Sequence, residues 1–567
     1  MNSGTNTVGP AAPDQGNPPD FDAIIIGAGL GGLCGLHRLR GMGLRTHVFE
    51  AASGVGGTWF WNRYPGARCD IESLEYSYSF SDELQQEWKW PERYGTQPEI
   101  LRYVQHVAQS FDLLRDIEFN TRILSATFDS KSNLWTVATN TGKTARATYC
   151  IMATGNLSTP RVPDFKGLDR FQGKWYHSGL WPHEGVDFTG LRVAVIGTGS
   201  SGIQMIPHIA QQAKHLHVFQ RTANYSLPAR NAPMDPEKDR QHKAHYPERR
   251  IAAYDTPFGM AGYPTPTKSA LEATPEERQR TYESKWQEGG SISFLYSYTD
   301  LLLNKEANDT ASEFVRQKIR GIVRDPEVAE LLAPKDHPIG TKRLCLDTNY
   351  YETYNRDNVT LVNARKAPIE EITAKGLRTS AADYEFDAIV FATGFDAMTG
   401  ALSEIDIRGT GGETLKEKWS AGPLTYLGLM VAGFPNMFLI TGPGSPGVKS
   451  QMIISIEQHA NWITDCLKFS RANGFHQIDA DPRAEQAWVG HVNEVANATL
   501  YPLANSWYVG ANIPGKPRVF MPYVGGVHTY KKHCDAVARN GYEGLVMRRV
   551  SSLAEAATSQ AEPVATR

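Results

Sequence analysis

Cysteine and histidine are sparse in this chain of 567 residues and show none of the spacings that bind metals. The six cysteines form no C-x-x-C pair, and the sixteen histidines form no H-E-x-x-H motif or other paired-ligand spacing. This pattern predicts no metal site, and it argues against a disulfide reductase, which needs a cysteine pair. Scattered cysteines also favour a reducing compartment, so a cytoplasmic location is expected.

A large charge of one sign and a long hydrophobic run are also missing. The chain has 58 basic and 61 acidic residues and a net charge of −3, which indicates neither a nucleic-acid partner nor a membrane-surface partner. The apolar run YLGLMVAGFPNMFLI at 426–440 contains glycine and proline and is short for a membrane span. The N-terminus has no basic patch followed by an apolar core, so no signal peptide is expected.

What remains is an ordinary globular composition with two unusual ends. Apolar residues make up 41% of the chain and charged residues 21%, and the length predicts two or three packed units. Residues 1–20 and 551–567 are small, polar, and rich in proline or alanine, so both are predicted to be disordered tails. We expect a monomer or a weak oligomer.

One motif occurs twice. An apolar run at 23–26 leads into GAGLGG at 27–32, and a second apolar run leads into GTGSSG at 197–202. A helical pattern follows each turn, and then a second predicted strand, HVFEAAS at 47–53 or HVFQRTA at 217–223. This is the G-x-G-x-x-G dinucleotide fingerprint in its strand–turn–helix context, where the glycines allow a tight turn, close approach of a pyrophosphate and helix packing.

The two copies differ where a ribose would bind. At the same distance from the first glycine, one copy has Glu50 and the other has Gln220 followed by Arg221. A carboxylate accepts ribose hydroxyls and repels a 2′-phosphate, whereas a guanidinium suits that phosphate. The first site is therefore predicted to bind FAD and the second NADPH. The alternative, one decayed and purely structural copy, is disfavoured because both copies keep the full context.

Two further apolar segments, at 149–155 and 386–396, contain the triplet A-T-G. In flavoproteins with two dinucleotide domains, such segments mark where the chain passes between the domains. The predicted fold is α/β, with two Rossmann-like domains and a helical insertion in which Thr274 begins a helix. The predicted FAD domain comprises 21–150 and 386–550, the NADPH domain 151–227 and 336–385, and the helical insertion 228–335.

The linker FQGKWYHSGLWP matches the fingerprint F-x-G-x-x-x-H-x-x-x-W-P at Phe171, Gly173, His177, Trp181 and Pro182. Upstream, GGTWFWNRYPGARCD at 56–70 matches a second motif. On these motifs the chain resembles the type I Baeyer–Villiger monooxygenases, from Phe21 to Arg548. The segments 352–359 and 505–521 resemble the phenylacetone and steroid monooxygenase branch. The resemblance implies that His177 is a hinge residue that couples domain motion and does no chemistry itself.

The resemblance implies an enzyme that uses FAD, NADPH and O2 to insert one oxygen atom of O2 next to a ketone carbonyl. The product is an ester or lactone, formed through a C4a-peroxyflavin and a tetrahedral adduct. The peroxide must stay anionic and sheltered from water, which requires a permanent positive charge nearby. An arginine keeps its charge in a dry pocket, whereas a lysine can lose it. By resemblance, Arg343 in PIGTKRLCLD is the catalytic cation and Asp70 orients it. The alternatives are a solvated Lys–Arg pair and an aspartate that only caps a turn.

The resemblance also implies residues that bind both cofactors and the substrate. For FAD they are Gly27, Gly29, Gly32, Glu50, Gly57, Thr58, Trp59, Asp70, Tyr76 and Ile123. For NADP they are Arg68, Thr198, Gly199, Ser200, Ser201, Gly202, Gln204, Arg221, Thr222, Lys342, Arg343 and Trp507. For the substrate they are Gly447, Val448, Met452 and Trp507.

Two other functions compete with ketone oxygenation. A flavin-containing monooxygenase that oxidises sulfides or amines uses a protonated hydroperoxide and does not need Arg343 in the same way. A non-catalytic redox sensor would keep the glycines and lose Arg343 and Asp70. The Trp181-Pro182 pair, Arg343 and Asp70 favour the ketone monooxygenase, with a bulky aryl-alkyl, cyclic or steroid-like ketone as the expected substrate.

Overall fold

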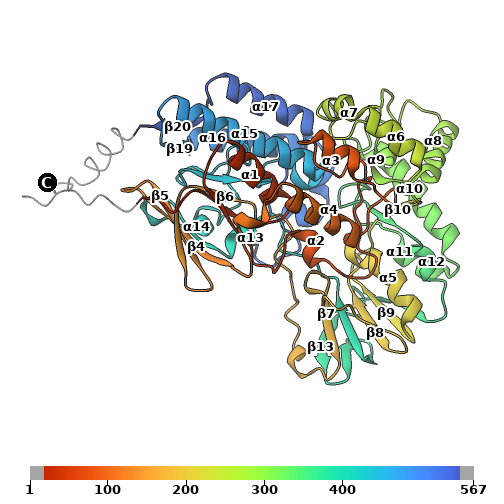
Figure 1. The fold of residues 1–567 in the computed structure, drawn as a ribbon. Helices are drawn as coiled ribbons and strands as arrows, with labels where there is room; N and C mark the ends of the chain where they lie inside the picture. The colour runs from red at the N-terminus through yellow and green to blue at the C-terminus, as the bar shows by residue number, and fades with distance from the viewer. Residues whose placement is uncertain (1–17, 550–567) are drawn as a thin grey trace, which may run out of the picture.

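Two sheets organise the chain, and each contains the strand that leads into one of the glycine turns (Figure 1). The computed structural model describes residues 18–549, so the tails predicted at 1–20 and 551–567 lie outside the described residues except for 18–20. Asp20 is tied to the fold, because its carboxylate accepts a hydrogen bond from the Arg146 amide at 2.8 Å and its carbonyl accepts one from Arg45 at 2.9 Å. The predicted N-terminal tail therefore does not extend to residue 20.

The first sheet is built around β1 (Phe21–Ile26), which lies parallel between β2 (Thr46–Phe49) and β6 (Thr144–Met152). Its strand order is β17-β4-β5-β6-β1-β2-β3, and β18 pairs with β6. The other strands are β3 (Ile117–Glu118), β4 (Ile123–Asp129), β5 (Leu134–Thr139), β17 (Asp406–Arg408) and β18 (Met437–Leu439). Segments far apart in the sequence thus share one sheet.

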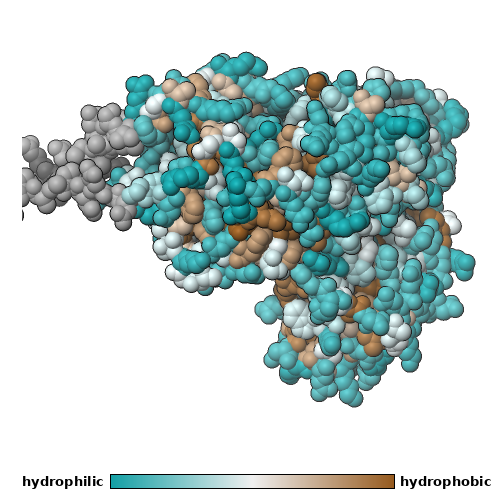
Figure 2. Space-filling model, viewed as in Figure 1, coloured by the Kyte–Doolittle hydropathy of each residue, from teal (hydrophilic) through white to brown (hydrophobic). Residues whose placement is uncertain are grey.

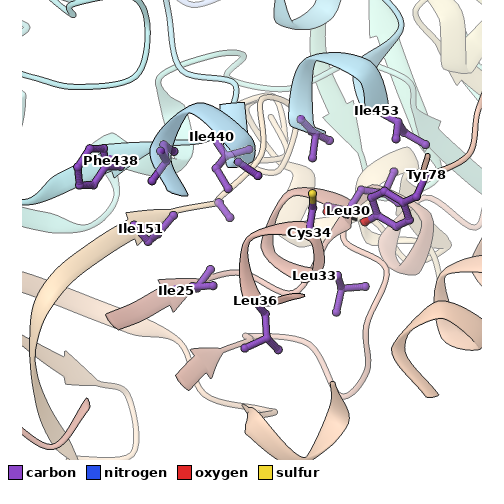
Figure 3. Close-up of a cluster of buried hydrophobic side chains, with 14 of the residues drawn as sticks. Ile25, Leu30, Leu33, Cys34, Leu36, Tyr78, Ile151, Phe438, Ile440 and Ile453 are labelled. Carbon is purple, nitrogen blue, oxygen red and sulfur yellow. Dashed lines mark hydrogen bonds between the residues drawn. The ribbon is translucent and has the colours of Figure 1, made fainter. Parts of the chain in front are cut away.

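Helices from both halves of the chain cover this sheet. Helix α1 (Leu30–Gly41) packs against α15 (Met452–Ala472), and Figure 3 shows side chains of α1 and β1 beside Ile151, Phe438 and Ile440. The apolar run of β1 is explained by this burial on both faces. The other elements of this body are α2 (Thr58–Trp61), α3 (Asp82–Glu87), α4 (Gln97–Ser110), α13 (Gly400–Ser403), α14 (Leu415–Lys418), α16 (Pro482–Asn497), α17 (Val527–Arg539), β19 (Gln477–Ala480) and β20 (Leu545–Arg548).

The second sheet is parallel throughout, with the order β12-β9-β8-β16-β7. Its elements are β7 (Lys174–His177), β8 (Arg192–Ile196), α5 (Ser200–Gln212), β9 (His215–Gln220), β12 (Val359–Asn363) and β16 (Ala388–Phe391). Every residue of β16 pairs with β8, so the domain change predicted at residue 386 is wrong, and the second unit continues through Phe391. The boundary could not be predicted from the sequence, because the apolar pattern of a strand does not show which strand it pairs with.

The chain enters and leaves this second unit along adjacent segments. Pro160 and Phe395 form an isolated bridge, and the Arg161 amide donates to the Gly394 carbonyl at 2.9 Å. A small antiparallel sheet also belongs to this unit, formed by β13 (Ile369–Thr373), β14 (Gly376–Thr379) and β15 (Asp383–Glu385).

Helices fill most of the segment between β9 and β12. They are α6 (Pro236–Ala244), α7 (Tyr246–Ala253), α8 (Pro275–Glu288), α9 (Ser291–Leu295), α10 (Lys305–Ile322), α11 (Pro326–Leu332) and α12 (Tyr350–Thr353). Thr274 caps α8 by accepting a hydrogen bond from the Glu277 amide, which is the helix start predicted from the sequence. The ends of the insertion meet where β10 (Ser226–Pro228) pairs with β11 (Cys345–Asp347).

The surface is mostly hydrophilic on the face seen in Figure 2, and hydrophobic residues gather in small areas, mainly near α2 and α4. Within residues 18–549, no helix has the length and apolar character needed to cross a bilayer. The same residues contain no group of three or more histidine, cysteine, aspartate or glutamate side chains that could hold a metal ion.

Candidate active site

The first glycine of each turn has the same surroundings in both units. Gly27 and Gly197 have φ values of 103° and 111°, which favour glycine. A Cβ on Gly27 would lie 2.6 Å from the Ala153 carbonyl oxygen, and one on Gly197 would lie 2.5 Å from that of Ala392. Ala153 and Ala392 begin the two A-T-G triplets. The first residue of each triplet therefore packs directly against the glycine turn of its own unit.

Both glycine turns open into a helix whose first amides are free. Helices α1 and α5 have Gly29 and Gly199 as N-caps, and neither cap makes a side-chain hydrogen bond. A Cβ on Gly32 would lie 1.8 Å from the Gly27 carbonyl oxygen, and one on Gly202 would meet Gly197 in the same way at 2.3 Å. Both turns lie where the strand order reverses, beside β1 and β8, so each helix N-terminus could hold a pyrophosphate.

The segment after the first turn faces it closely. Gly57 has a φ of 53°, and a Cβ there would lie 2.9 Å from the Gly29 Cα. Thr58 is exposed next to it, and Trp59 donates from its indole to the Tyr76 hydroxyl at 3.1 Å. The side chain of Ile123 is different, because it is buried in a core cluster and does not face a cleft.

Glu50 and Gln220 occupy equivalent positions with different partners. The Glu50 carboxylate accepts hydrogen bonds from the amides of Ala28 and Ala52 at 2.6 and 2.7 Å, which places it beside the first turn. Burial raises the pKa of Glu50, and these two hydrogen bonds oppose that effect. The Gln220 amide points elsewhere and donates to the Leu331 carbonyl at 2.7 Å. Gln220 thus contacts the helical insertion, and Arg221, which directly follows β9, is exposed.

A cluster of cations surrounds the end of β9. Lys342 is partly buried, and burial lowers its pKa, with Asp336 opposing and Arg221 and Arg365 adding to the decrease. Arg365 pairs with Asp336 at 3.0 Å and reaches the Thr222 hydroxyl at 3.4 Å. Lys342 and Arg365 lie near the Asp336 carboxylate and Arg221 lies near Lys342, so the three cations together could receive a phosphate. Sequence reasoning missed Arg365, although it follows β12, whose carboxyl end lies beside that of β9.

Arg221→Ala should raise the KM for NADPH by about 10- to 100-fold, because a lost hydrogen bond between charged groups costs about 1.5–3 kcal/mol. The KM for NADH should change little, since NADH has no 2′-phosphate. Steady-state oxidation of both cofactors measures this, with Arg378→Ala on the distant strand β14 as a control for loss of positive charge. Equal losses with NADPH and NADH would show that Arg221 does not read the phosphate.

Several predicted NADP residues join the two units to each other. The Tyr64 hydroxyl donates to Gln204 Oε1 at 2.8 Å, and Gln204 Nε2 donates to the Arg68 carbonyl at 3.0 Å. Arg68 also pairs with Glu92 at 3.3 Å. Gln204 is therefore fully used in docking the 57–70 segment onto α5. Around it, Thr198 donates to the Thr222 carbonyl at 3.1 Å, and the Ser200 hydroxyl lies 3.1 Å from the Cys345 sulfur, while Ser201 adjoins Tyr64.

Arg343 and Asp70 meet between the two units, 273 positions apart in sequence. Arg343 Nε donates to Asp70 Oδ2 at 3.0 Å, and Nη1 reaches the Val448 carbonyl at 3.4 Å. The Arg343 side chain keeps 34% of its surface exposed, whereas Asp70 keeps 9%. Burial acts to lower the pKa of Arg343, but Asp70 and nearby groups outweigh it and hold that pKa above its usual value. Nη2 makes no contact with a partner within 18–549, so it can donate to a bound group.

The loop around Val448 lies beside Arg343, because the Val448 carbonyl accepts a hydrogen bond from Arg343 Nη1. Gly447 and Val448 are buried, and Met452 begins α15 directly after them. Val448, Met452 and Trp507 belong to one apolar cluster, and the Trp507 ring lies 4.2 Å from that of Tyr508. The predicted substrate residues are thus together in the structure, next to the Arg343–Asp70 pair. Sequence reasoning missed Tyr508, which lies in the same cluster, and Lys449, whose ammonium lies over the Tyr508 ring.

The linker fingerprint lies at the edge of the second sheet. His177 ends β7, is 1% exposed, and accepts a hydrogen bond from the Gly179 amide at 3.0 Å. Burial lowers the pKa of His177 to about 4, so its ring is neutral near pH 7. Trp181 is buried against Tyr176 and Phe188, and a Cβ on Gly173 would clash with Phe171. The residues of the fingerprint, which ends at Pro182, therefore have a packing role.

Comparison with known proteins identifies relatives along nearly the whole chain. Residues 22–232 match the family model described as Flavin-binding monooxygenase-like. A Baeyer–Villiger monooxygenase from Pseudooceanicola batsensis is 44% identical, over 94% of this chain and 97% of its own. An oxidized steroid monooxygenase bound to NADP has a TM-score of 0.89 at 52% identity, covering 93% of this chain and 99% of that one. A closed crystal structure of cyclohexanone monooxygenase has a TM-score of 0.91 at 41% identity, covering 94% and 99%.

The two dinucleotide units and the site between them define a flavoprotein monooxygenase. Within this class, the chain belongs to the Baeyer–Villiger monooxygenase family. Membership favours ketone oxygenation over sulfide or amine oxidation and over a redox sensor.

Proposed function

We propose that this protein is a Baeyer–Villiger monooxygenase that uses FAD, NADPH and O2 to convert a ketone to an ester or lactone. The observation that carries the proposal is the fixed guanidinium of Arg343, held by Asp70 at 3.0 Å while Nη2 is free. FAD, reduced by NADPH, supplies the activation of dioxygen. The chain must hold positive charge where negative charge develops, and it must keep water away.

Arg343 is the proposed catalytic residue. Its guanidinium stays protonated and can donate from Nη2 to the oxygen atom on which negative charge builds up as the carbonyl is attacked. Asp70 fixes the orientation of the guanidinium and offsets part of the cost of burying its charge. The apolar residues Val448, Met452 and Trp507 are proposed to exclude water and contact the ketone.

The first glycine turn is proposed to hold FAD. The α1 N-terminus and Gly29 would receive the pyrophosphate, and Glu50 would bind the ribose, since its carboxylate already lies beside the Ala28 amide. Gly57, Thr58, Trp59 and Tyr76 would contact the rest of the cofactor. Ile123 would contribute through its main chain, because its side chain faces the core.

The second turn is proposed to hold NADPH. The α5 N-terminus at Gly199, Ser200 and Ser201 would receive the pyrophosphate, and Arg221, Thr222, Lys342 and Arg365 would bind the 2′-phosphate. Thr198 and Gly202 shape the turn, and Gln204 and Arg68 hold it against the 57–70 segment. Trp507 is proposed to cover the nicotinamide.

The substrate is proposed to be a bulky ketone. A steroid monooxygenase and a cyclohexanone monooxygenase share the fold over at least 93% of this chain, and the side-chain cluster that includes Val448, Met452 and Trp507 is large, apolar and aromatic. We also propose that the enzyme acts in the cytoplasm as a monomer or a weak oligomer.

Turnover with isotopically labelled dioxygen tests the function. Purified holoenzyme, NADPH and a panel of aryl, cyclic and steroid ketones should yield an ester or lactone carrying one heavy oxygen atom, detected by mass spectrometry. Consumption of NADPH with only labelled hydrogen peroxide, across the whole panel, would contradict the assignment as a ketone monooxygenase.

A further inference from the structure

Lys449 places a second positive charge near Arg343. It ends the short 3₁₀ turn Gly447–Lys449, next to Val448, whose carbonyl accepts from Arg343. Its ammonium nitrogen lies 4.1 Å from the ring centre of Tyr501 and 4.4 Å from that of Tyr508. The side chain therefore runs across two aromatic faces within the apolar cluster of Val448, Met452 and Trp507.

This ammonium has no anionic partner. No carboxylate in residues 18–549 forms an ion pair with Lys449, and its ammonium nitrogen makes no hydrogen bond there and lies over the rings of Tyr501 and Tyr508. Burial, and after it the charge of Arg343, lowers the pKa of Lys449 well below its usual value. Arg343 has Asp70 as its carboxylate partner, whereas Lys449 is close enough to Arg343 to feel its charge and has no such partner in the described residues.

Tyr508 supplies a second donor without an acceptor. The residue is 0% exposed, and its hydroxyl has no hydrogen-bond partner in the described chain. The charges of Arg343 and Asp70 both act on its pKa, which places this hydroxyl close to the ion pair. A buried hydroxyl without a partner is costly, and the Lys449 ammonium over the Tyr508 ring has no anion, so the two groups together indicate a ligand that brings an acceptor.

Lys449 lies away from the positions proposed for the cofactor phosphates. The 2′-phosphate cations Arg221, Lys342 and Arg365 lie at the ends of β9 and β12, and the pyrophosphate positions lie at helix N-termini. Lys449 lies instead among the residues proposed to contact the ketone. The nicotinamide proposed to lie beside Trp507 carries no negative charge, so the anionic partner of Lys449 is expected on the substrate.

We propose that Lys449 is a specificity-determining residue that binds a carboxylate carried by the ketone, with the Tyr508 hydroxyl as a second donor. The inference rests on the proposed function and narrows its substrate class to oxo acids, in which a few carbon atoms separate the carbonyl from the carboxylate. The carboxylate takes no part in the bond changes. It orients the carbonyl toward Arg343 and supplies the anionic partner that Lys449 lacks.

Matched acids and esters test this with the holoenzyme. The probes are 4-oxopentanoate, 5-oxohexanoate and 6-oxoheptanoate, each against its methyl ester, with wild type, Lys449→Met and Lys449→Arg. Calorimetric titration gives Kd without turnover, and steady-state ester formation gives kcat/KM. At least one acid should bind wild type about 10- to 100-fold more tightly than its ester, as expected for a charged hydrogen bond.

The Lys449→Met variant should lose that preference by the same factor, while its Kd for the methyl esters changes less than about 3-fold. The Lys449→Arg variant should keep most of the preference, since it keeps the charge. The melting temperature of Lys449→Met should not fall, because the substitution removes an unpaired charge from an apolar site.

Two results would overturn the proposal. The first is an acid-to-ester ratio of Kd that is the same in wild type and Lys449→Met for all three pairs. The second is an equal rise of hydrogen peroxide release with acids and esters in Lys449→Met, which would place the charge in support of the flavin reaction instead. Failure of the proposed function is separate: acid binding would still depend on Lys449, but no ketone would give an ester.

Discussion

Arg343→Ala should abolish oxygen transfer to the ketone while NADPH oxidation continues. Loss of a preorganised donor at a developing oxyanion typically costs about 100- to 1,000-fold in kcat. Here the same side chain also supplies the permanent charge, so ester formation should fall at least that far. Consumed NADPH should then appear as hydrogen peroxide. Ester yield, peroxide and NADPH are measured in the same reactions.

Two further variants separate charge from geometry. Arg343→Lys keeps a charge but loses the forked contact with Asp70 and Val448, so it should stay severely impaired. Asp70→Asn keeps Arg343 but weakens its orientation, and it should lose less activity than Arg343→Ala. Flavin absorbance and thermal melting check that each variant retains FAD and its fold. Normal coupling of NADPH oxidation to ester formation in folded Arg343→Ala would remove Arg343 from the mechanism.

Gly32→Ala should yield protein without bound flavin. The added methyl group would lie 1.8 Å from the Gly27 carbonyl oxygen, so either the turn or the first helical residues must shift. Both carry the amides proposed to bind the pyrophosphate, and the affinity for FAD should fall at least about 100-fold, because about 3 kcal/mol is lost when a buried site is distorted. The flavin absorbance of the purified protein, with added FAD as a titration, measures the loss.

Gly35→Ala is the matched control in the same helix. Its Cβ would meet only the side-chain methyl groups of Ile440 and Ile25, at 3.3 and 3.5 Å, and alanine favours a helix over glycine. This variant should purify with a full complement of FAD. If Gly32→Ala kept its flavin as well as Gly35→Ala does, the first turn would not be the FAD site.

The parts of the fold that depend on a few adjacent residues could be predicted from local sequence patterns. The glycine turns at Gly27 and Gly197 are readable because a positive φ and a helix start require glycine at fixed spacing. The partnership of Arg343 with Asp70 came from the family resemblance, and the structure brings the two side chains into contact. Their roles in catalysis and those of the other cofactor residues remain proposals.

Properties that depend on distant segments could not be predicted. The position of β16 follows from pairing with β8, which lies nearly 200 residues earlier, and an apolar strand is compatible with either sheet. The sequence pattern places Gln220 with Arg221 at a ribose position, yet the Gln220 amide donates to the Leu331 carbonyl on a helix of the insertion. Arg365 and Lys449 carry no motif, and their positions become informative only when the neighbouring charges are in place.

The bridge between Pro160 and Phe395 has a consequence for how the protein folds. A guest domain whose two ends are adjacent can be placed within a host without stretching the host chain or closing a wide loop. The second unit meets this condition, since its first and last segments are joined by the Arg161–Gly394 hydrogen bond. Once the guest has folded, the segments of β6 and β17 are brought together as if joined by a short loop. The intervening length of chain then adds little to the entropy cost of completing the first sheet.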